Sequence, residues 1–196
     1  MPSALDTFER VHPTTRAEWR RWLEQHHTTS PGVWLISWKA GSGQPRVAYA
    51  EAVEEALCFG WIDSRPNKLD RERFMQLLSP RQPRSAWSKL NQTRVEKLIA
   101  AGLMTQAGLD KINAAKMSGR WTELDAVENL AMPEDLTIAL QADNTAEINF
   151  SAFSPSSKKS ILFWIQGAKR SETRAKRIAE TVALAAKNLK ANHWRQ

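Results

Sequence analysis

The stretch from Glu55 to Asn91 constrains the fold more than any other part of the sequence. It begins Glu-Ala-Leu-Cys-Phe-Gly-Trp-Ile-Asp-Ser and ends Leu-Ser-Pro-Arg-Gln-Pro-Arg-Ser-Ala-Trp-Ser-Lys-Leu-Asn. Gly60 lies where a helix over residues 48–58 would take a left-handed C-terminal cap. The runs at 61–64 and 73–78 are typical of strands, and the residues between them supply a turn. We therefore expect a helix followed by an antiparallel hairpin.

The segments on either side of this stretch extend the pattern. The branched and aromatic run at 33–38 is typical of a buried strand, and a short strand is expected at 8–11. Apolar residues at helical spacing predict further helices at 16–26 (capped by Thr14 or Thr15), 86–101 (capped by Ser85) and 105–117, and from about Pro133, Pro155 and Ser171. These elements predict an α+β fold in which a small antiparallel sheet with flanking helices is followed by a helical C-terminal segment.

Charge is unevenly distributed along this chain of 196 residues and net charge +7. Residues 121–150 hold seven acidic and no basic side chains, whereas residues 151–196 hold ten basic and two acidic ones. We divide the chain into an α+β domain at 1–120, an acidic helical connector at 121–150 and a basic helical segment at 151–196. The basic segment either pairs with the connector or faces an anionic partner such as nucleic acid, with Trp164 or Trp194 stacking on bases.

The composition, with 42% hydrophobic and 25% charged residues, is that of an ordinary globular protein. The first ten residues lack the basic and apolar regions of a signal peptide, and no apolar run approaches the roughly 20 residues of a membrane span. The single cysteine, Cys58, cannot form an internal disulfide. We expect a cytoplasmic protein without a membrane partner, either a monomer or a homodimer. Nine tryptophans against one tyrosine suggest that large rings fill the core.

The strongest candidate site is the predicted start of the helix at Ser85. Arg81 and Arg84 lie beside backbone N–H groups that already favour negative charge, so a phosphate or carboxylate would suit this position. Alternatively, the arginines pair with the protein's own carboxylates and the serines only cap the helix. The candidate ligand-binding residues, which supply charge, hydrogen bonds or an apolar wall, are Arg81, Arg84, Ser85, Ser88, Asn91, Trp61, Trp87 and Asp63.

Two further residues are candidates for catalysis. Asp63 could act as a general acid or base if an apolar wall raised its pKa, although an aspartate at this position more often orients a turn. Cys58 lies in an apolar helix end, where a buried and inert thiol is expected. The histidines, His12, His26, His27 and His193, are scattered. Adjacent histidines on a helix cannot face one metal ion, so we expect neither a metal site nor a cofactor.

These motifs resemble those of the YdeI/OmpD-associated family, also described as bacteriocin-protection proteins. The residues that carry the resemblance are Glu51-Ala52, Glu55 to Asp63, Ser79-Pro80-Arg81, Ser85 to Asn91, Ala115-Lys116, Gly119-Arg120-Trp121, Ser154-Pro155-Ser156, Trp164-Ile165, Ala168-Lys169 and Glu172 to Arg177. The resemblance covers nearly the whole chain. It implies an N-terminal α+β domain similar to YjbR/CyaY-like proteins and a helical OmdA-type segment after it. It transfers no catalytic residues.

We therefore predict a protein that binds a small anionic or phosphate-bearing ligand at a helix N-terminus. Two alternatives stay open. One is a protein that binds nucleic acid or another anionic partner through its basic C-terminal helices. The other is an enzyme that uses Asp63 or Cys58.

Overall fold

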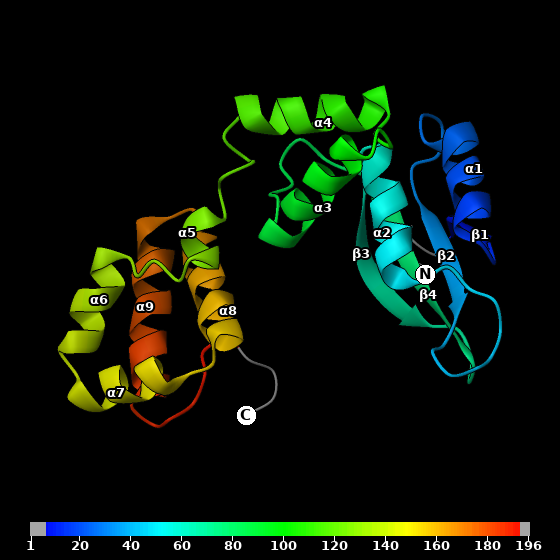
Figure 1. The fold of residues 1–196 in the computed structure, drawn as a ribbon. Helices are drawn as coiled ribbons and strands as arrows, with labels where there is room; N and C mark the ends of the chain where they lie inside the picture. The colour runs from blue at the N-terminus through cyan, green and yellow to red at the C-terminus, as the bar shows by residue number, and fades with distance from the viewer. Residues whose placement is uncertain (1–6, 193–196) are drawn as a thin grey trace. The chain divides into compact units, whose positions relative to one another are not determined.

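The structure is a computed structural model, and it describes residues 7–192. The chain divides between Thr122 and Glu123 into two compact units, here called the N-terminal unit and the C-terminal unit. The N-terminal unit combines a sheet with helices, and the C-terminal unit is built from helices (Figure 1). The predicted α+β class with a helical C-terminal part is thus confirmed. His193 and Trp194 lie outside the described residues.

A four-stranded sheet in the order β1-β2-β4-β3 forms the base of the N-terminal unit. Strands β3 and β4 form the expected antiparallel hairpin, and β4 also pairs antiparallel with β2. The sheet is mixed rather than wholly antiparallel as predicted, because β1 pairs parallel with β2. The helix between these two strands returns the chain to the same end of the sheet, which makes them parallel. The strands are β1 (Glu9–Val11), β2 (Val33–Trp38), β3 (Trp61–Lys68) and β4 (Arg73–Pro80).

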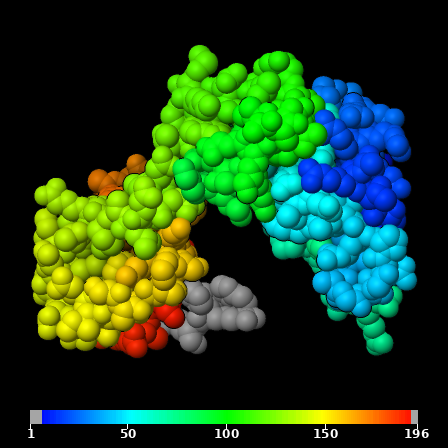
Figure 2. All heavy atoms as spheres, viewed as in Figure 1, coloured from blue at the N-terminus to red at the C-terminus, as the bar shows by residue number. Residues whose placement is uncertain are grey.

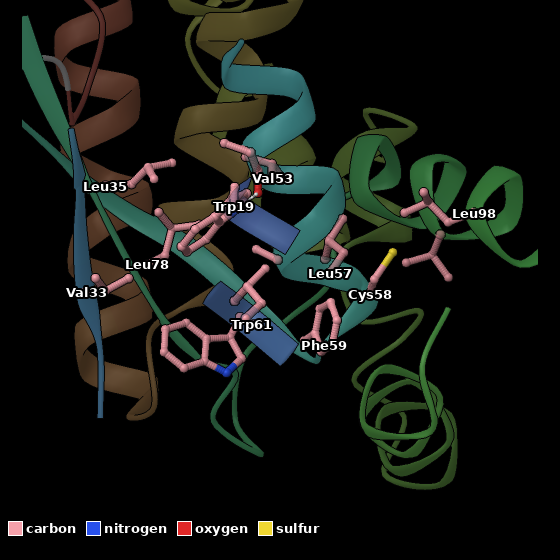
Figure 3. Packing of buried hydrophobic residues seen from close by; sticks show 14 of the residues in the cluster. Trp19, Val33, Leu35, Val53, Leu57, Cys58, Phe59, Trp61, Leu78 and Leu98 are labelled. Atoms are coloured by element: carbon pink, nitrogen blue, oxygen red, sulfur yellow. Dashed lines mark hydrogen bonds between the residues drawn. The ribbon is translucent and has the colours of Figure 1, made fainter. Parts of the chain in front are cut away.

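The main core of the N-terminal unit lies between one face of this sheet and the helices (Figure 3). Trp19 from the first helix and Leu57 from the second are fully buried together with Leu78 of β4. The third and fourth helices add Leu98 and Ile112 to the same core. The atoms of these two helices belong to the green part of the surface in Figure 2. The helices are α1 (Arg16–His26), α2 (Tyr49–Cys58), α3 (Lys89–Ala100) and α4 (Gln106–Met117).

Helix α3 begins one turn later than the sequence predicts. Its N-cap is Ser88, whose Oγ accepts a hydrogen bond from the Asn91 backbone N–H at 3.4 Å. The prediction of Ser85 as the N-cap was wrong, because residues 81–87 form a loop and the Ser85 N–H instead closes a turn onto the Gln82 carbonyl. The side chain of either serine can cap a helix. Trp87, which is 2% exposed, is buried while it is still part of the loop, so the helix begins only after it.

The C-terminal unit packs five helices around a second core. Leu136 and Phe150 from the acidic part of the sequence are buried with Ile161 and Ile165 from the basic part. The helices α5 and α7 were not predicted. The helices are α5 (Asp125–Glu128), α6 (Glu134–Gln141), α7 (Asn144–Ala152), α8 (Pro155–Gln166) and α9 (Ser171–Ala185). The division of this region into a connector and a tail stays a prediction.

Across residues 7–192, none of the helices combines the length and the apolar character needed to cross a membrane.

Candidate functional site

Arg81 lines a cavity of about 160 Å³ in the N-terminal unit, between the loop that follows β4 and helix α4. We call it the Arg81 cavity. Trp87 and the loop form one wall, and residues of α4 form the other. Its lining consists of Arg81, Gln82, Pro83, Ser85, Trp87, Lys111, Ala114, Ala115 and Ser118. The cavity therefore contains three of the predicted site residues together with a second cation, Lys111.

The Arg81 guanidinium is buried and only partly satisfied. The residue is 4% exposed, its Nη2 donates to the Ala86 carbonyl at 2.9 Å, and its central carbon lies 3.7 Å from the centre of the Trp87 ring. Its Nε and Nη1 atoms are buried and have no hydrogen-bond partner among the described residues. Leaving charged donors unpaired in the interior costs about 1–3 kcal/mol or more for each group.

Arg81 nevertheless remains a cation at neutral pH. Burial lowers its pKa from 12.5 to about 10, and the nearby negative charge of Asp63 opposes this shift. No carboxylate of the described residues lies within ion-pair distance of Arg81. The alternative in which Arg81 is locked onto one of the protein's own carboxylates therefore does not apply to it.

Lys111 reaches the cavity because helix α4 approaches the end of α2 unusually closely. A side chain at Gly108 would meet the Cys58 carbonyl oxygen at 2.4 Å, so only glycine allows this approach. The Thr105 hydroxyl also donates to the Cys58 carbonyl, at 2.6 Å. Gly60 has φ +74°, and a Cβ there would meet the Lys111 Cγ at 2.7 Å. The lysine stem therefore packs over Gly60.

The hydroxyl groups of the cavity differ in their availability. The Ser118 Oγ donates to the Ala114 carbonyl at 2.8 Å, so its proton is already used at the end of α4. The half-buried Ser85 side chain has no hydrogen-bond partner among residues 7–192, so its hydroxyl is free to donate. The donors available for a negatively charged group are thus Arg81, Lys111 and Ser85, set against the apolar face of Trp87. This arrangement can hold an anion by charge-assisted hydrogen bonds.

The other predicted site residues lie elsewhere. Arg84 is exposed and does not line the cavity. Ser88 caps α3, and the Asn91 side chain accepts a hydrogen bond from Arg94 at 2.9 Å. Trp61 is buried and donates to the His27 carbonyl at 3.1 Å. Lys111 was missed because it lies far from Arg81 in the sequence.

Asp63 is engaged with Tyr49 rather than standing free in an apolar pocket. The Tyr49 hydroxyl donates to Asp63 Oδ2 at 2.6 Å. Burial, followed by this hydrogen bond and the charge of Asp63, raises the pKa of Tyr49 to about 12. The tyrosine therefore stays protonated and acts as a donor to the carboxylate at neutral pH.

Cys58 is fully buried, and we expect it to react slowly with thiol reagents. Burial, with the nearby charge of Glu55, raises its pKa from 9.0 to about 11. The thiolate, which is the reactive form, is then roughly 100-fold less abundant at pH 8 than in an unfolded chain, and burial slows access further. Labelling with a chromogenic disulfide reagent, in native buffer and in denaturant, measures this ratio. Equal rates would show that the end of α2 opens readily.

The basic residues of the C-terminal unit are partly engaged within that unit. Lys159 pairs with Glu128 at 2.7 Å, and Arg174 pairs with Asp135 at 2.6 Å. Arg177 donates to the Trp164 carbonyl and stacks on its ring. A nucleic-acid surface on these helices stays a prediction. In the described part of the chain, no group of three or more potential ligand side chains is arranged to hold a metal ion.

Comparisons with known proteins match the two parts of the chain to two families. Residues 11–111 match the family described as Domain of unknown function (DUF8412). Residues 129–188 match the family described as Bacteriocin-protection, YdeI or OmpD-Associated, which confirms the predicted resemblance for that segment. The expected likeness of the N-terminal part to YjbR/CyaY-like proteins is not shown, since its match is to DUF8412. No curated protein and no solved structure matches the chain.

Proposed function

We propose that this chain, which belongs to the DUF8412 family, binds a small anionic ligand in the Arg81 cavity of its N-terminal unit. The observation that carries the proposal is the buried Arg81 side chain: the residue is 4% exposed, and two of its guanidinium nitrogens have no hydrogen-bond partner among the described residues. A carboxylate, phosphate or sulfate group would supply the missing acceptors. Lys111 and Ser85 would donate further hydrogen bonds to the anion. The anion would thus be bound by the loop at 81–87 and not, as the sequence predicts, by the N-terminus of a helix.

The energetics favour a role in binding over a role in stability. A buried cation without a carboxylate partner is costly in the ligand-free protein, and its lowered pKa reflects that cost. Natural proteins commonly keep such unfavourable groups where a ligand uses them. The guanidinium is also the side chain whose planar fork best matches the oxygens of a carboxylate or phosphate.

The size of the cavity suits a small ligand group. Its volume of about 160 Å³ is far larger than the roughly 10–15 Å³ that one water needs. Inorganic phosphate and sulfate are the simplest probes of the proposed anion.

Isothermal titration compares the wild type with the variants Arg81→Lys, Arg81→Met and Arg84→Ala, and the NMR signal of the Arg81 Nε–H is followed in the wild type and in Arg84→Ala, which retain it. In the wild type, phosphate or sulfate should shift this signal and bind. Arg81→Lys keeps the charge but loses the fork, so we expect binding roughly 10-fold or more weaker. Arg81→Met should abolish binding while the free energy of unfolding stays within about 1 kcal/mol of the wild type, because one hydrogen bond and an unfavourable charge are lost together.

Arg84→Ala is the matched control for this experiment. Arg84 lies three residues further along the same loop, carries the same charge and is exposed outside the cavity. Its removal should leave anion binding unchanged. Binding that survives Arg81→Met, or that is lost in Arg84→Ala, would contradict the proposal. A large loss of stability in Arg81→Met would instead assign Arg81 a structural role.

A cytoplasmic location is part of the same proposal. It is supported by Cys58, the single cysteine of the sequence, which is a free and buried thiol suited to a reducing compartment.

A further inference from the structure

The charged residues that line the Arg81 cavity are all of one sign, and this bears on the class of anion. Arg81 and Lys111 line the cavity, whereas no carboxylate of residues 7–192 does. The negative charge of Asp63 reaches Arg81, but Asp63 lies outside the lining and its Oδ2 already accepts the Tyr49 hydroxyl at 2.6 Å. Because the two cations outnumber this one carboxylate, the attraction grows with each negative charge that the anion carries.

The hydrogen-bond donors of the cavity come from two different walls. Arg81 and Ser85 belong to the loop at 81–87, whereas Lys111 belongs to α4. A carboxylate presents its two oxygens in one plane, so it can face one wall well and the other poorly. A phosphoryl group is tetrahedral and presents oxygens on several sides at once. The placement of the donors therefore favours a tetrahedral anion.

The size of the cavity limits how much of a ligand it encloses. Its volume of about 160 Å³ equals that of about five waters at roughly 30 Å³ each, which suits one phosphorus with its four oxygens. Arg81 and Trp87 are buried at the floor, with 4% and 2% exposure, whereas Gln82, Pro83 and Ala114 are exposed at the rim. These rim residues carry no charge. The phosphoryl group would thus lie inside, and its substituent would extend past the rim.

We propose that the Arg81 cavity selects a dianionic phosphoryl group, as found in phosphate monoesters, over carboxylates and singly charged oxyanions. This inference rests on the proposed function, because it names the class of anion that the same cavity holds.

The test uses two esters of the same shape and of different charge. At pH 8, methyl phosphate carries two charges, because the second pKa of a phosphate monoester is about 6, whereas methyl sulfate carries one. Isothermal titration of the wild type should show that methyl phosphate binds roughly 10-fold or more tightly than methyl sulfate or acetate. The comparison needs no variant, so it does not depend on how well any substitution folds.

Lys111→Met removes one of the two cations and keeps an unbranched stem over Gly60. It should weaken the binding of methyl phosphate roughly 10-fold or more and reduce its advantage over methyl sulfate to within about three-fold, because the second charge loses its partner. Lys116→Met is the matched control, since Lys116 lies on the same helix, is exposed and does not line the cavity. It should bind both esters as the wild type does.

The outcomes separate this inference from the proposed function. If methyl sulfate or acetate binds the wild type as tightly as methyl phosphate, the selection of a dianion is overturned and anion binding in the Arg81 cavity stands. The same holds if the advantage of methyl phosphate survives Lys111→Met or is lost in Lys116→Met. If none of the three anions binds the wild type, or if their binding survives Arg81→Met, both proposals are overturned.

Discussion

Glu55→Ala is expected to lower the free energy of unfolding of the N-terminal unit by about 3 kcal/mol. The Glu55 side chain is 3% exposed, and it joins α2 to α1 through Arg16 at 2.5 Å and Arg20 at 2.7 Å. Its removal leaves two arginines facing a methyl group. Because their side chains are 34% and 28% exposed, water can partly replace the lost partner, which places the loss at the lower end for a broken buried pair.

Glu54→Ala is the control for this prediction. Glu54 is the neighbouring residue on the same helix, loses the same charge, and pairs with Arg16 at 2.9 Å from a side chain that is 30% exposed. Its removal should cost less than about 1 kcal/mol. Denaturant titration monitored by tryptophan fluorescence measures the loss of stability in both variants. The signal reports on the N-terminal unit, because all tryptophans except Trp164 and Trp194 belong to it. Equal losses in the two variants would show that burial adds nothing to the Glu55 pairs.

The sequence predicts those elements whose pattern is local. The strand at Val33–Trp38 and the helix at Arg16–His26 have the predicted bounds, and Gly60 adopts the expected positive φ of +74°. In each case, the side chains that decide the structure lie within a few residues of one another. Periodicity and capping chemistry are therefore sufficient.

The site depends on contacts that no local pattern contains. Arg81 could be recognised as a candidate from its sequence context, but its burial against Trp87 follows from how the whole loop folds. Lys111 lies 30 positions further along the chain and joins the site only because α4 packs against α2. Ser85 and Ser88 were indistinguishable as caps because both precede helical sequence, and tertiary packing decided between them.

Gly108→Ala tests the packing that brings Lys111 to the Arg81 cavity, and it should destabilise the N-terminal unit by about 2–3 kcal/mol. The new Cβ would lie 2.4 Å from the Cys58 carbonyl oxygen and 2.8 Å from the Leu57 carbonyl oxygen. These are backbone atoms at the end of α2, so they cannot turn aside as a flexible side chain could. The loss is expected even though alanine favours a helix over glycine by about 1 kcal/mol.

The same substitution should weaken phosphate binding, because α4 can relieve the clash only by moving away and carrying Lys111 with it. Asn113→Ala is the control on the exposed side of the same helix, where alanine should be neutral or slightly stabilising and should leave binding unchanged. Denaturant titration and phosphate titration of both variants measure the two effects. If Gly108→Ala matched Asn113→Ala in stability, α4 could not pack this closely on α2. If stability fell but phosphate affinity did not, Lys111 would have no part in holding the anion.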